Sequence, residues 1–589
     1  MSHELGVMRG LIGSGWRSGN AENGIQYAGL NAFRSGPLFR ETRGLSNPVP
    51  IVRVVERGNA GFRLRLHGVP PIIACSHRPP VPVMTESRRR MLVLLVLTVL
   101  LSCGGAEQED RRFAYDSHPA PIVVDGEITD WASVPLRHND VGDGTGMTLE
   151  RLRVAHDNNH LFLRIEVGRP ISLQQRHRLT LHLDTDDDPS TGTDTLGLGA
   201  DVSWTFGQRS GTVGGTAVGH AALGLHVLPT VRAEVFEMAL DRGAQSDGSA
   251  LFPGDRMRVA WSTTGDRLPD AAGGVGYAFT DTARIADTPT LDRPAAADLR
   301  LLSYNVKNDF ERDRAAFSGP GRRASYRRIL TAVRPDVVAL QEVYNQTAAE
   351  LGRAAEESLG LPTDWSWAKR GPDLVLGSRF PIEDTHAIAG FRQYESGAFL
   401  LNARAVWGRP LLVVVMHPPC CNDPATEDAP SRNVQRQRVV DGVAAFLRRV
   451  TRGAGPFEVP SGTPIMIVGD MNFVGDPQQP RTLRTGAIVD TTMSGPGAPP
   501  DWDDTPLLDV NPRQTGAPLH TTWTDPGSSF VPGRLDYAFV SDSVAEVVHA
   551  FVLRTSTLSD AQRAAHNLRA EDTRVASDHL PVVVDLAAP

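Results

Sequence analysis

The segment "TPIMIVGDMN", residues 463–472, decides the fold of the C-terminal half of this chain. Its first part is an apolar, β-branched run, which is typical of a buried strand. The run then passes into Gly469, Asp470, Met471 and Asn472, so an acid and an amide stand two residues apart where the strand ends. A carboxylate beside a buried strand carries a desolvation cost, and we therefore expect Asp470 to have a partner.

The same arrangement recurs along the C-terminal half. Apolar strands are predicted within 299–306, 335–343, 372–382, 409–421, 533–540 and 576–586. Most of them carry polar residues near their ends: Asn305, Glu342, His417, Asp536, Asp578 and His579. Amphipathic helices are predicted at 322–334 and 436–450, between these strands. Strands alternating with helices indicate an α/β domain. Because several polar residues converge at strand ends, we predict a site built on a rigid sheet.

The residue types narrow the chemistry of that site. Carboxylate and amide oxygens suit hard Mg²⁺ or Mn²⁺, whereas zinc prefers more histidine or cysteine. The sequence shows neither a G-x-S-x-G nucleophile elbow nor a P-loop. A hard cation beside two histidines suits phosphoryl chemistry, in which the metal neutralises the phosphate and a base positions water.

Seven motifs occur in the order typical of one superfamily: "LSYNV", "LQEV", "SRFPI", "VVMHP", "IVGDMN", "RLDYAFVS" and "SDHLPVVVDL". Residues 298–589 thereby resemble the endonuclease/exonuclease/phosphatase superfamily, which includes deoxyribonuclease I and the neutral sphingomyelinases. The resemblance implies a deoxyribonuclease I-like four-layer α/β sandwich, with two packed sheets and helices outside. It also implies a Mg²⁺- or Mn²⁺-dependent phosphodiesterase.

The resemblance also assigns roles to individual residues. Glu342 and Asn305 match the first metal-site positions, and Asp578 serves the same metal site. Asp470 matches the residue that orients or deprotonates the attacking water, while Asn472 holds the phosphate.

The two histidines receive different roles from the resemblance. His579 contacts the phosphate, with Asp536 orienting it. His417 acts as general acid on the leaving group, and its alternative is a structural loop histidine.

The substrate stays open at the sequence level. The continuation "HPPCCNDPATED", residues 417–428, departs from the usual family pattern. Nucleic acid and a phospholipid head group both remain candidate substrates. The adjacent Cys420 and Cys421 are interpreted as small loop residues, with a strained vicinal bridge as the alternative.

Residues 116–292 predict an all-β sandwich domain. "RLRVAHDNNHLFLRIEVG", residues 151–168, alternates with period two around an Asx-rich turn, which indicates a hairpin. With residues 124–135 and 181–204, this domain resembles the β-sandwich of family 9 carbohydrate-binding modules. The resemblance implies a binding or spacer module with a candidate glycan ligand. Trp131 and Trp204 either stack on that ligand or fill the core.

An acidic loop in this domain is a candidate calcium site. Asp184, Asp186 and Asp188, together with Asp187, offer hard oxygen ligands for Ca²⁺. The loop lacks the glycine and glutamate positions of an EF-hand. A solvated acidic turn is the equal alternative.

Residues 84–103 have the pattern of a secretory signal. Arg88, Arg89 and Arg90 precede a short apolar core and a small-residue junction. The end, "LLSCGG", resembles the lipobox of bacterial lipoproteins, which implies lipidation of Cys103 and export to the cell envelope. Gly104 after the cysteine suggests the outer membrane by the same resemblance, and residues 104–115 form a linker.

Residues 1–83 precede that signal, and a signal cannot act from within a chain. We therefore hypothesise that residues 1–83 are not part of the natural protein; a disordered extension is the alternative.

Composition adds limits. The 589-residue chain is 41% hydrophobic and 22% charged, as globular proteins are. A net charge of −8 gives no overall attraction to nucleic acid or acidic membranes. Among 60 basic residues only Lys307 and Lys369 are lysines.

From the motifs and the signal pattern, we predict an enzyme of the cell envelope that cleaves phosphodiesters, most simply a nuclease-like one. The alternatives are a phospholipid head-group phosphodiesterase and a non-catalytic glycan-binding protein, and the oligomeric state stays open.

Overall fold

A computed structural model describes residues 115–281, 285–308, 321–355, 361–362, 364–421 and 431–588. The predicted signal, Cys103, residues 1–83 and nearly all of the 104–115 linker lie outside these residues. Within the described ranges, no helix is both long and apolar enough to cross a membrane.

The first described domain is a β-sandwich. One sheet has the order β1 (His138–Asn139), β2 (Leu149–His156), β3 (His160–Ile171), β11 (Ala233–Asp241) and β10 (His226–Leu228). The other has the order β15 (Arg267–Leu268), β14 (Arg256–Ser262), β4 (Thr180–Asp184), β7 (Val202–Thr205), β8 (Ser210–Val213) and β9 (Thr216–Val218), with β16 (Val275–Ala278) on β14. Two small hairpins complete it: β5 (Thr193–Thr195) with β6 (Leu198–Ala200), and β12 (Gln245–Ser246) with β13 (Ser249–Ala250).

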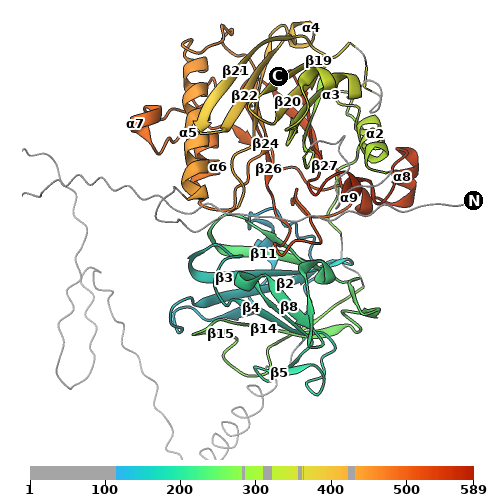
Figure 1. Cartoon of the computed structure of the whole chain (residues 1–589). Helices are drawn as coiled ribbons and strands as arrows, with labels where there is room; N and C mark the ends of the chain where they lie inside the picture. The colour runs from blue at the N-terminus through green and yellow to red at the C-terminus, as the bar shows by residue number, and fades with distance from the viewer. Residues whose placement is uncertain are drawn as a thin grey trace, which may run out of the picture. The chain divides into compact units, whose positions relative to one another are not determined.

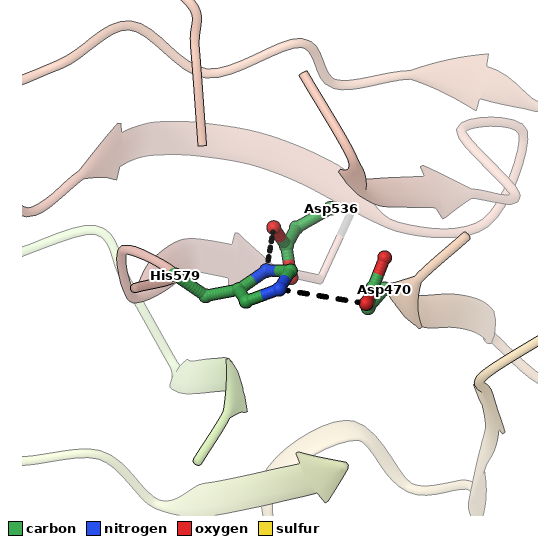
Figure 2. Close-up of side chains that lie close together, drawn as sticks. All are labelled: Asp470, Asp536 and His579. Carbon is green, nitrogen blue, oxygen red and sulfur yellow. Dashed lines mark hydrogen bonds and ion pairs between the residues drawn. The ribbon is translucent and has the colours of Figure 1, made fainter. Parts of the chain in front are cut away.

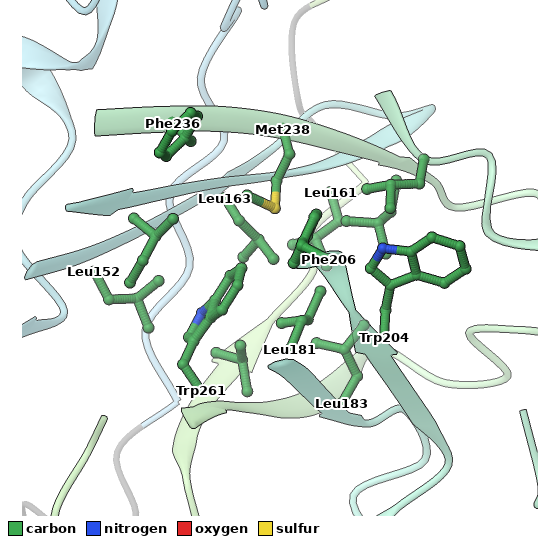
Figure 3. Packing of buried hydrophobic residues seen from close by; sticks show 14 of the residues in the cluster. Leu152, Leu161, Leu163, Leu181, Leu183, Trp204, Phe206, Phe236, Met238 and Trp261 are labelled. Carbon is green, nitrogen blue, oxygen red and sulfur yellow. The ribbon is translucent and has the colours of Figure 1, made fainter. Parts of the chain in front are cut away.

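The core of this domain lies between the two sheets (Figure 3). The predicted hairpin is β2 and β3, which pair antiparallel. Leu161 and Leu163 from β3 meet Leu181 and Trp204 from the other sheet, because alternate side chains of a strand face the same side. Trp131 and Trp204 are both fully buried, so the structure assigns both tryptophans to the protein interior rather than to an exposed stacking face.

The C-terminal α/β domain contains two six-stranded sheets. One has the order β19 (Ser366–Arg370), β20 (Leu374–Ser378), β18 (Val337–Gln341), β17 (Leu299–Asn305), β28 (Val582–Ala587) and β27 (Glu546–Val552). The other has the order β21 (Ile382–Phe391), β22 (Tyr394–Leu401), β23 (Leu411–Met416), β24 (Ile465–Asp470), β26 (Asp536–Val540) and β25 (Leu508–Asp509). The helices are α2 (Arg322–Val333), α3 (Ala348–Ala354), α4 (Arg404–Trp407), α5 (Arg432–Thr451), α6 (Gln478–Thr485), α7 (Thr491–Ser494), α8 (Asp560–Ala565) and α9 (Asp572–Ala576).

These sheets pack face to face and carry helices outside. Leu301 of β17 and Val413 of β23 share one core cluster between the sheets. Leu302, the next residue of β17, points the other way and packs with Ile329 of α2. Val443 of α5 packs against the outer face of the second sheet, and Figure 1 shows α5 running along β21 and β22. The order of layers is therefore helix, sheet, sheet, helix, as the superfamily resemblance implied.

Both predicted helices are present. The helix predicted at 322–334 is α2, which ends at Val333. The helix predicted at 436–450 is α5, which begins earlier, at Arg432, because the Ser431 side chain caps it by accepting a hydrogen bond from the Val434 amide.

The described parts of the two domains belong to one compact unit and share hydrophobic cores. Val531 of the α/β domain is 2% exposed and lies in the core cluster of the β-sandwich. Leu519 packs in a second cluster with Val124 and Trp131 of the β-sandwich, and Val124 bridges Leu519 by backbone pairing. The contact is therefore an apolar, buried interface rather than a flexible tether.

Candidate active site

Polar side chains leave both sheets of the α/β domain at one edge. Asn305 ends β17 and lies in register with Gln341, the last residue of β18, so Glu342 follows beside it. Asp470 ends β24 and pairs with Asp536 at the start of β26. The two packed sheets thus bring together strand ends that are far apart in sequence.

Asp470 lies at the centre of this group and is 2% exposed. Its carboxylate accepts hydrogen bonds from the Asn305 side chain at 3.0 Å and from the Asn472 backbone and side chain at 3.1 and 3.2 Å. Gly469 makes this geometry possible, since its φ is 141° and a Cβ there would lie 2.0 Å from the Met416 carbonyl oxygen. The expected partners of the buried carboxylate are therefore present.

Two histidines face the same oxygen of Asp470. The Nε2 atoms of His417 and His579 each lie 3.6 Å from Asp470 Oδ2. Each Nδ1 atom contacts a carboxylate of its own: Asp536 at 2.8 Å for His579, and Asp373 at 2.5 Å for His417. Figure 2 shows His579 held between Asp536 and Asp470. The site therefore consists of two Asp–His pairs around one buried aspartate.

The surrounding charges set the protonation of both imidazoles. Burial lowers the pKa of His417, but its hydrogen bond to Asp373 and the nearby carboxylates raise it to about 9. Burial also lowers the pKa of His579, but Asp536 and Asp470 raise it to about 10. Both side chains are therefore cationic near pH 7 and are suited to bind anions or donate protons.

Asp470 behaves differently from its partners. Burial raises its pKa to about 6, although the positive charges of His579 and His417 oppose the rise. It is consequently a carboxylate above that pH, with a proton affinity close to neutrality. A general base works best with a pKa of this kind.

The side chains of the two asparagines are hydrogen-bonded to other groups of the site. Asn305 donates one amide hydrogen to Asp470 and the other to Glu342 at 3.1 Å. Its oxygen accepts a hydrogen bond from the Lys307 backbone. Asn472 donates its amide hydrogens to Asp470 and to the Pro418 carbonyl at 3.1 Å. In the structure the amide nitrogens of both asparagines are hydrogen-bonded to neighbouring groups. The roles that the resemblance implies, metal for Asn305 and phosphate for Asn472, stay predictions.

Asp578 lies at the other side of the site. It contacts the Lys307 ammonium at 2.9 Å and accepts a hydrogen bond from the Trp523 indole at 3.3 Å. Burial raises the pKa of Asp578, but the charges of His579 and Lys307 bring it below its ordinary value. Asp578 is therefore a stable carboxylate beside His579.

Sequence reasoning missed Asp373, Lys307 and Trp523. Asp373 precedes β20, which runs antiparallel to β18, so the start of β20 lies where β18 ends. It accepts a hydrogen bond from the Glu342 backbone at 3.3 Å as well as contacting His417. The signal in the sequence was an acid directly before the buried strand in "PDLVLGS".

The comparisons with known proteins bear on this same segment. No curated protein sequence matches the chain. Residues 302–579 match the model of the Endonuclease/Exonuclease/phosphatase family. That range covers slightly less than half of the chain and runs from β17 to His579. This part of the protein is an endonuclease/exonuclease/phosphatase domain, and the members of that family are phosphoester hydrolases.

The solved structures to which the chain is similar include three from different organisms. The human Nocturnin catalytic domain with bound sulfate is 17% identical over 49% of this chain and 93% of its own, with a TM-score of 0.30. Sphingomyelinase C from Streptomyces griseocarneus is 17% identical over 49% and 98%, with a TM-score of 0.29. Truncated TDP2 from Caenorhabditis elegans is 12% identical over 49% and 98%, with a TM-score of 0.30.

The endonuclease/exonuclease/phosphatase domain has a donor set that fits a hard divalent cation. Glu342, Asp470 and Asp578 all line one pocket. Burial is the main cause that raises the pKa of Asp470, and repulsion from the Glu342 carboxylate adds to it. A cation relieves such repulsion, and carboxylate oxygens are the ligands that Mg²⁺ and Mn²⁺ prefer.

A tighter group of metal-ligand residue types lies beside these carboxylates. Donor atoms of Asp470, Asp536 and His579 all lie within 4.8 Å of one another. His579 Nδ1 already contacts Asp536, as second-sphere carboxylates do when they orient a histidine. Glu342 and Asp578, which line the same pocket, could therefore hold the cation.

The predicted calcium loop is only partly assembled. Asp184 and Asp186 lie with Asp201 in a group whose donor oxygens are within 4.8 Å of one another. Asp188 instead accepts hydrogen bonds from the Ser190 backbone and hydroxyl at 2.9 and 2.6 Å. Asp187 lies elsewhere and contacts the Arg258 guanidinium at 2.8 Å.

Cys420 and Cys421 are exposed thiols in the structure. Both line the pocket that contains Asp470 and His417. The departure from the family pattern after His417 therefore does border the site, as far as Cys421.

Proposed function

We propose that the endonuclease/exonuclease/phosphatase domain hydrolyses phosphodiesters with the help of Mg²⁺ or Mn²⁺. The observation that carries this proposal is the buried Asp470 between two cationic histidines, tied to Glu342 through one asparagine. A base, two proton donors or anion-binding groups, and a cation-binding carboxylate are the parts that phosphoryl transfer to water requires.

Each residue of the site has its own task in this reaction. Asp470 accepts the proton of the attacking water, because its pKa lies near 6 and it has a carboxylate oxygen facing the pocket. His579, held by Asp536, donates to a phosphoryl oxygen. His417, held by Asp373, donates a proton to the departing ester oxygen. When bound at Glu342, the cation would neutralise charge on the phosphate.

Metal removal and replacement test the proposal. Hydrolysis of methyl para-nitrophenyl phosphate is expected to vanish in EDTA and to return with Mg²⁺ or Mn²⁺. Glu342→Gln is expected to need more cation for half-maximal activity, because a neutral amide binds a hard cation more weakly than a carboxylate. Full activity in EDTA, or an unchanged cation requirement in Glu342→Gln, would refute the metal assignment.

We also propose a Ca²⁺ site in the β-sandwich, at Asp184, Asp186 and Asp201. Asp184 is fully buried, and its Oδ2 atom has no hydrogen-bond partner among the described residues. Burial and the neighbouring carboxylates raise the pKa of Asp184 to about 6. An unbonded buried carboxylate oxygen is costly, and a cation would satisfy it.

Thermal unfolding tests this second site. Ca²⁺ is expected to raise the Tm of the wild-type protein and of Asp188→Asn, since Asp188 lies outside the group. The shift should disappear in Asp184→Asn. Equal shifts in both variants would place the bound cation elsewhere.

We propose, finally, that the protein is an exported lipoprotein of a bacterial cell envelope, anchored through Cys103. The support is the sequence pattern of residues 84–103. Expression in a bacterial host should place a chain that starts at Met84 in membranes and its Cys103→Ser variant in the soluble fraction. A mature chain that retains residues 1–83 would contradict both the anchor and the start at Met84.

A further inference from the structure

The catalytic pocket is shared between the two domains. It has a volume of about 250 Å³, and its lining includes Glu342, His417, Asp470, Asp578 and His579. The lining also includes Ser172, Leu173, Gln174 and Gln175, which follow β3, Val227 of β10, and Pro229 and Thr230, which follow β10. Residues of the β-sandwich thus line the same pocket as the reacting groups.

The β-sandwich residues that line the pocket, here called the wall, are held in place by hydrogen bonds to the α/β domain. Gln174 binds Val531 twice: its side-chain nitrogen donates to the Val531 carbonyl at 3.2 Å, and its oxygen accepts from the Val531 amide at 2.7 Å. Thr230 donates to the Arg534 carbonyl at 3.1 Å. The loop from Phe530 to Gly533, which also lines the pocket, is thereby fixed by the β-sandwich.

The same loop leads to the catalytic residues. The Thr522 amide donates to the Gly533 carbonyl at 3.0 Å, and the Thr522 hydroxyl accepts from the Asp536 amide at 2.9 Å. Asp536 in turn holds His579. The wall is therefore connected to the Asp536–His579 pair by a chain of hydrogen bonds that runs through Thr522.

The chemistry of the lining defines what it accepts. Leu173, Val227, Phe530 and Val531 are apolar, and the described lining contains no lysine or arginine. A long polyanion binds through many phosphate contacts with such cationic side chains, so it gains little from this lining beyond the two histidines. Ligand pockets usually enclose roughly 300–1,000 Å³, so this pocket suits a small molecule.

We propose that the β-sandwich forms a substrate-selecting wall of the catalytic pocket, which admits small phosphodiesters with a compact uncharged group and disfavours polynucleotides. This inference rests on the proposed phosphodiesterase function and adds the substrate class. Ser172, half-buried and on the wall, is the residue at which a larger side chain narrows the pocket.

Two reporters with the same leaving group test the wall. Hydrolysis of methyl and of naphthyl para-nitrophenyl phosphate is measured with Mn²⁺ for three full-length proteins: the wild type, Ser172→Trp and Ala217→Trp. Ala217→Trp is the control, because Ala217 is exposed in β9 and does not line the pocket. In Ser172→Trp, kcat/KM for the naphthyl diester should fall about tenfold or more, with the methyl diester nearly unaffected. The control should match the wild type on both. Wild-type cleavage of duplex DNA should be slower by roughly two orders of magnitude than that of the methyl diester.

Other outcomes separate the possibilities. Equal naphthyl-to-methyl ratios in Ser172→Trp and the wild type, or the same loss in Ala217→Trp, would overturn the wall. Duplex DNA cleaved as fast as the methyl diester would overturn the substrate class. If Ser172→Trp has a lowered Tm, Gln175→Trp takes its place.

If the wild type hydrolyses neither diester, the proposed function is rejected. The wall is then tested by ligand binding instead of by activity. Phenylphosphonate with Mn²⁺ should then raise the Tm of the wild type and Ala217→Trp but not of Ser172→Trp. Equal Tm shifts in all three proteins would overturn the wall in that case also.

Discussion

At the scale of single residues, the site depends on how Asp470 is surrounded. It is nearly inaccessible, accepts three hydrogen bonds from two asparagines, and faces two imidazoles. Such a carboxylate is held in one orientation, which is what a base that must meet a bound water requires. Substitutions that keep its shape but remove its charge therefore separate catalysis from folding.

Asp470→Asn is expected to lower kcat for the methyl diester by about 10²–10⁴-fold, because an amide cannot accept the water proton. The unfolding temperature should change little, since the amide has nearly the same shape. Asp542→Asn, an exposed change in the same domain, is the matched control and should retain full activity. Comparable kcat values for the two variants would remove Asp470 from the mechanism.

The pH dependence tests the paired histidines. Activity should rise as the pH passes about 6, where Asp470 becomes a carboxylate, and fall above about 9, where His417 loses its proton. In Asp373→Asn the carboxylate that raises the His417 pKa is gone, so the alkaline limb should move to lower pH. The profile of kcat/KM measures this, and exposed Asp384→Asn should leave it unchanged. An alkaline limb that stays in place in Asp373→Asn would assign it to another group.

At the scale of elements, the critical point is the end of β24. Gly469 has a φ of 141°, and a Cβ there would collide with the Met416 carbonyl of β23, its parallel neighbour. Gly469→Ala is expected to destabilise the fold by about 1–3 kcal/mol or more and to displace Asp470, lowering activity as well.

A glycine in open space provides the comparison for Gly469. Gly408 has a φ of 66°, but among the described residues, its two chain neighbours aside, no atom lies within 4 Å of the place that an added Cβ would occupy. Gly408→Ala should therefore cost only about 1 kcal/mol and keep activity. Equal losses of stability in the two variants would show that backbone conformation, not the contact with β23, makes Gly469 necessary.

The elements also show what the sequence could and could not predict. Period and composition located β17, β18, β24, α2 and α5, because each has a long apolar pattern buried against a neighbour. Asp373 was not predicted as a site residue, because it meets Glu342 and His417 only through the antiparallel pairing of strands in the folded protein. The asparagines lie beside the other predicted site residues, but which group each amide donates to depends on side-chain geometry that residue order does not contain.

At the scale of the whole molecule, the two domains depend on each other for burial. Leu519 is 1% exposed and packs among β-sandwich residues, so Leu519→Ser should lower the free energy of unfolding by about 2–5 kcal/mol. Leu508→Ser, in the edge strand β25 and 39% exposed, is the matched change and should stay within about 0.5 kcal/mol of the wild type. Denaturant unfolding checks both. Equal effects of the two would mean that the interface contributes no stability.

The sequence divided the chain into modules but could not predict this interface. The β-sandwich was expected to be a binding or spacer module, because it resembles family 9 carbohydrate-binding modules. The contacts of Gln174 with Val531 and of Val124 with Leu519 join residues hundreds of positions apart, and neither residue type carries a recognisable motif.

The scarcity of lysine has a practical consequence. Lys307 contacts Asp578, and Lys369 donates to the carbonyls of Val343, Tyr344 and Gln346 in the segment after Glu342. Every side-chain amine of the chain therefore reports on the catalytic centre. Acylating reagents, which label most proteins indiscriminately, become here selective probes: loss of activity on labelling, and protection by Mn²⁺ with phenylphosphonate, would map the centre by mass spectrometry without a single substitution.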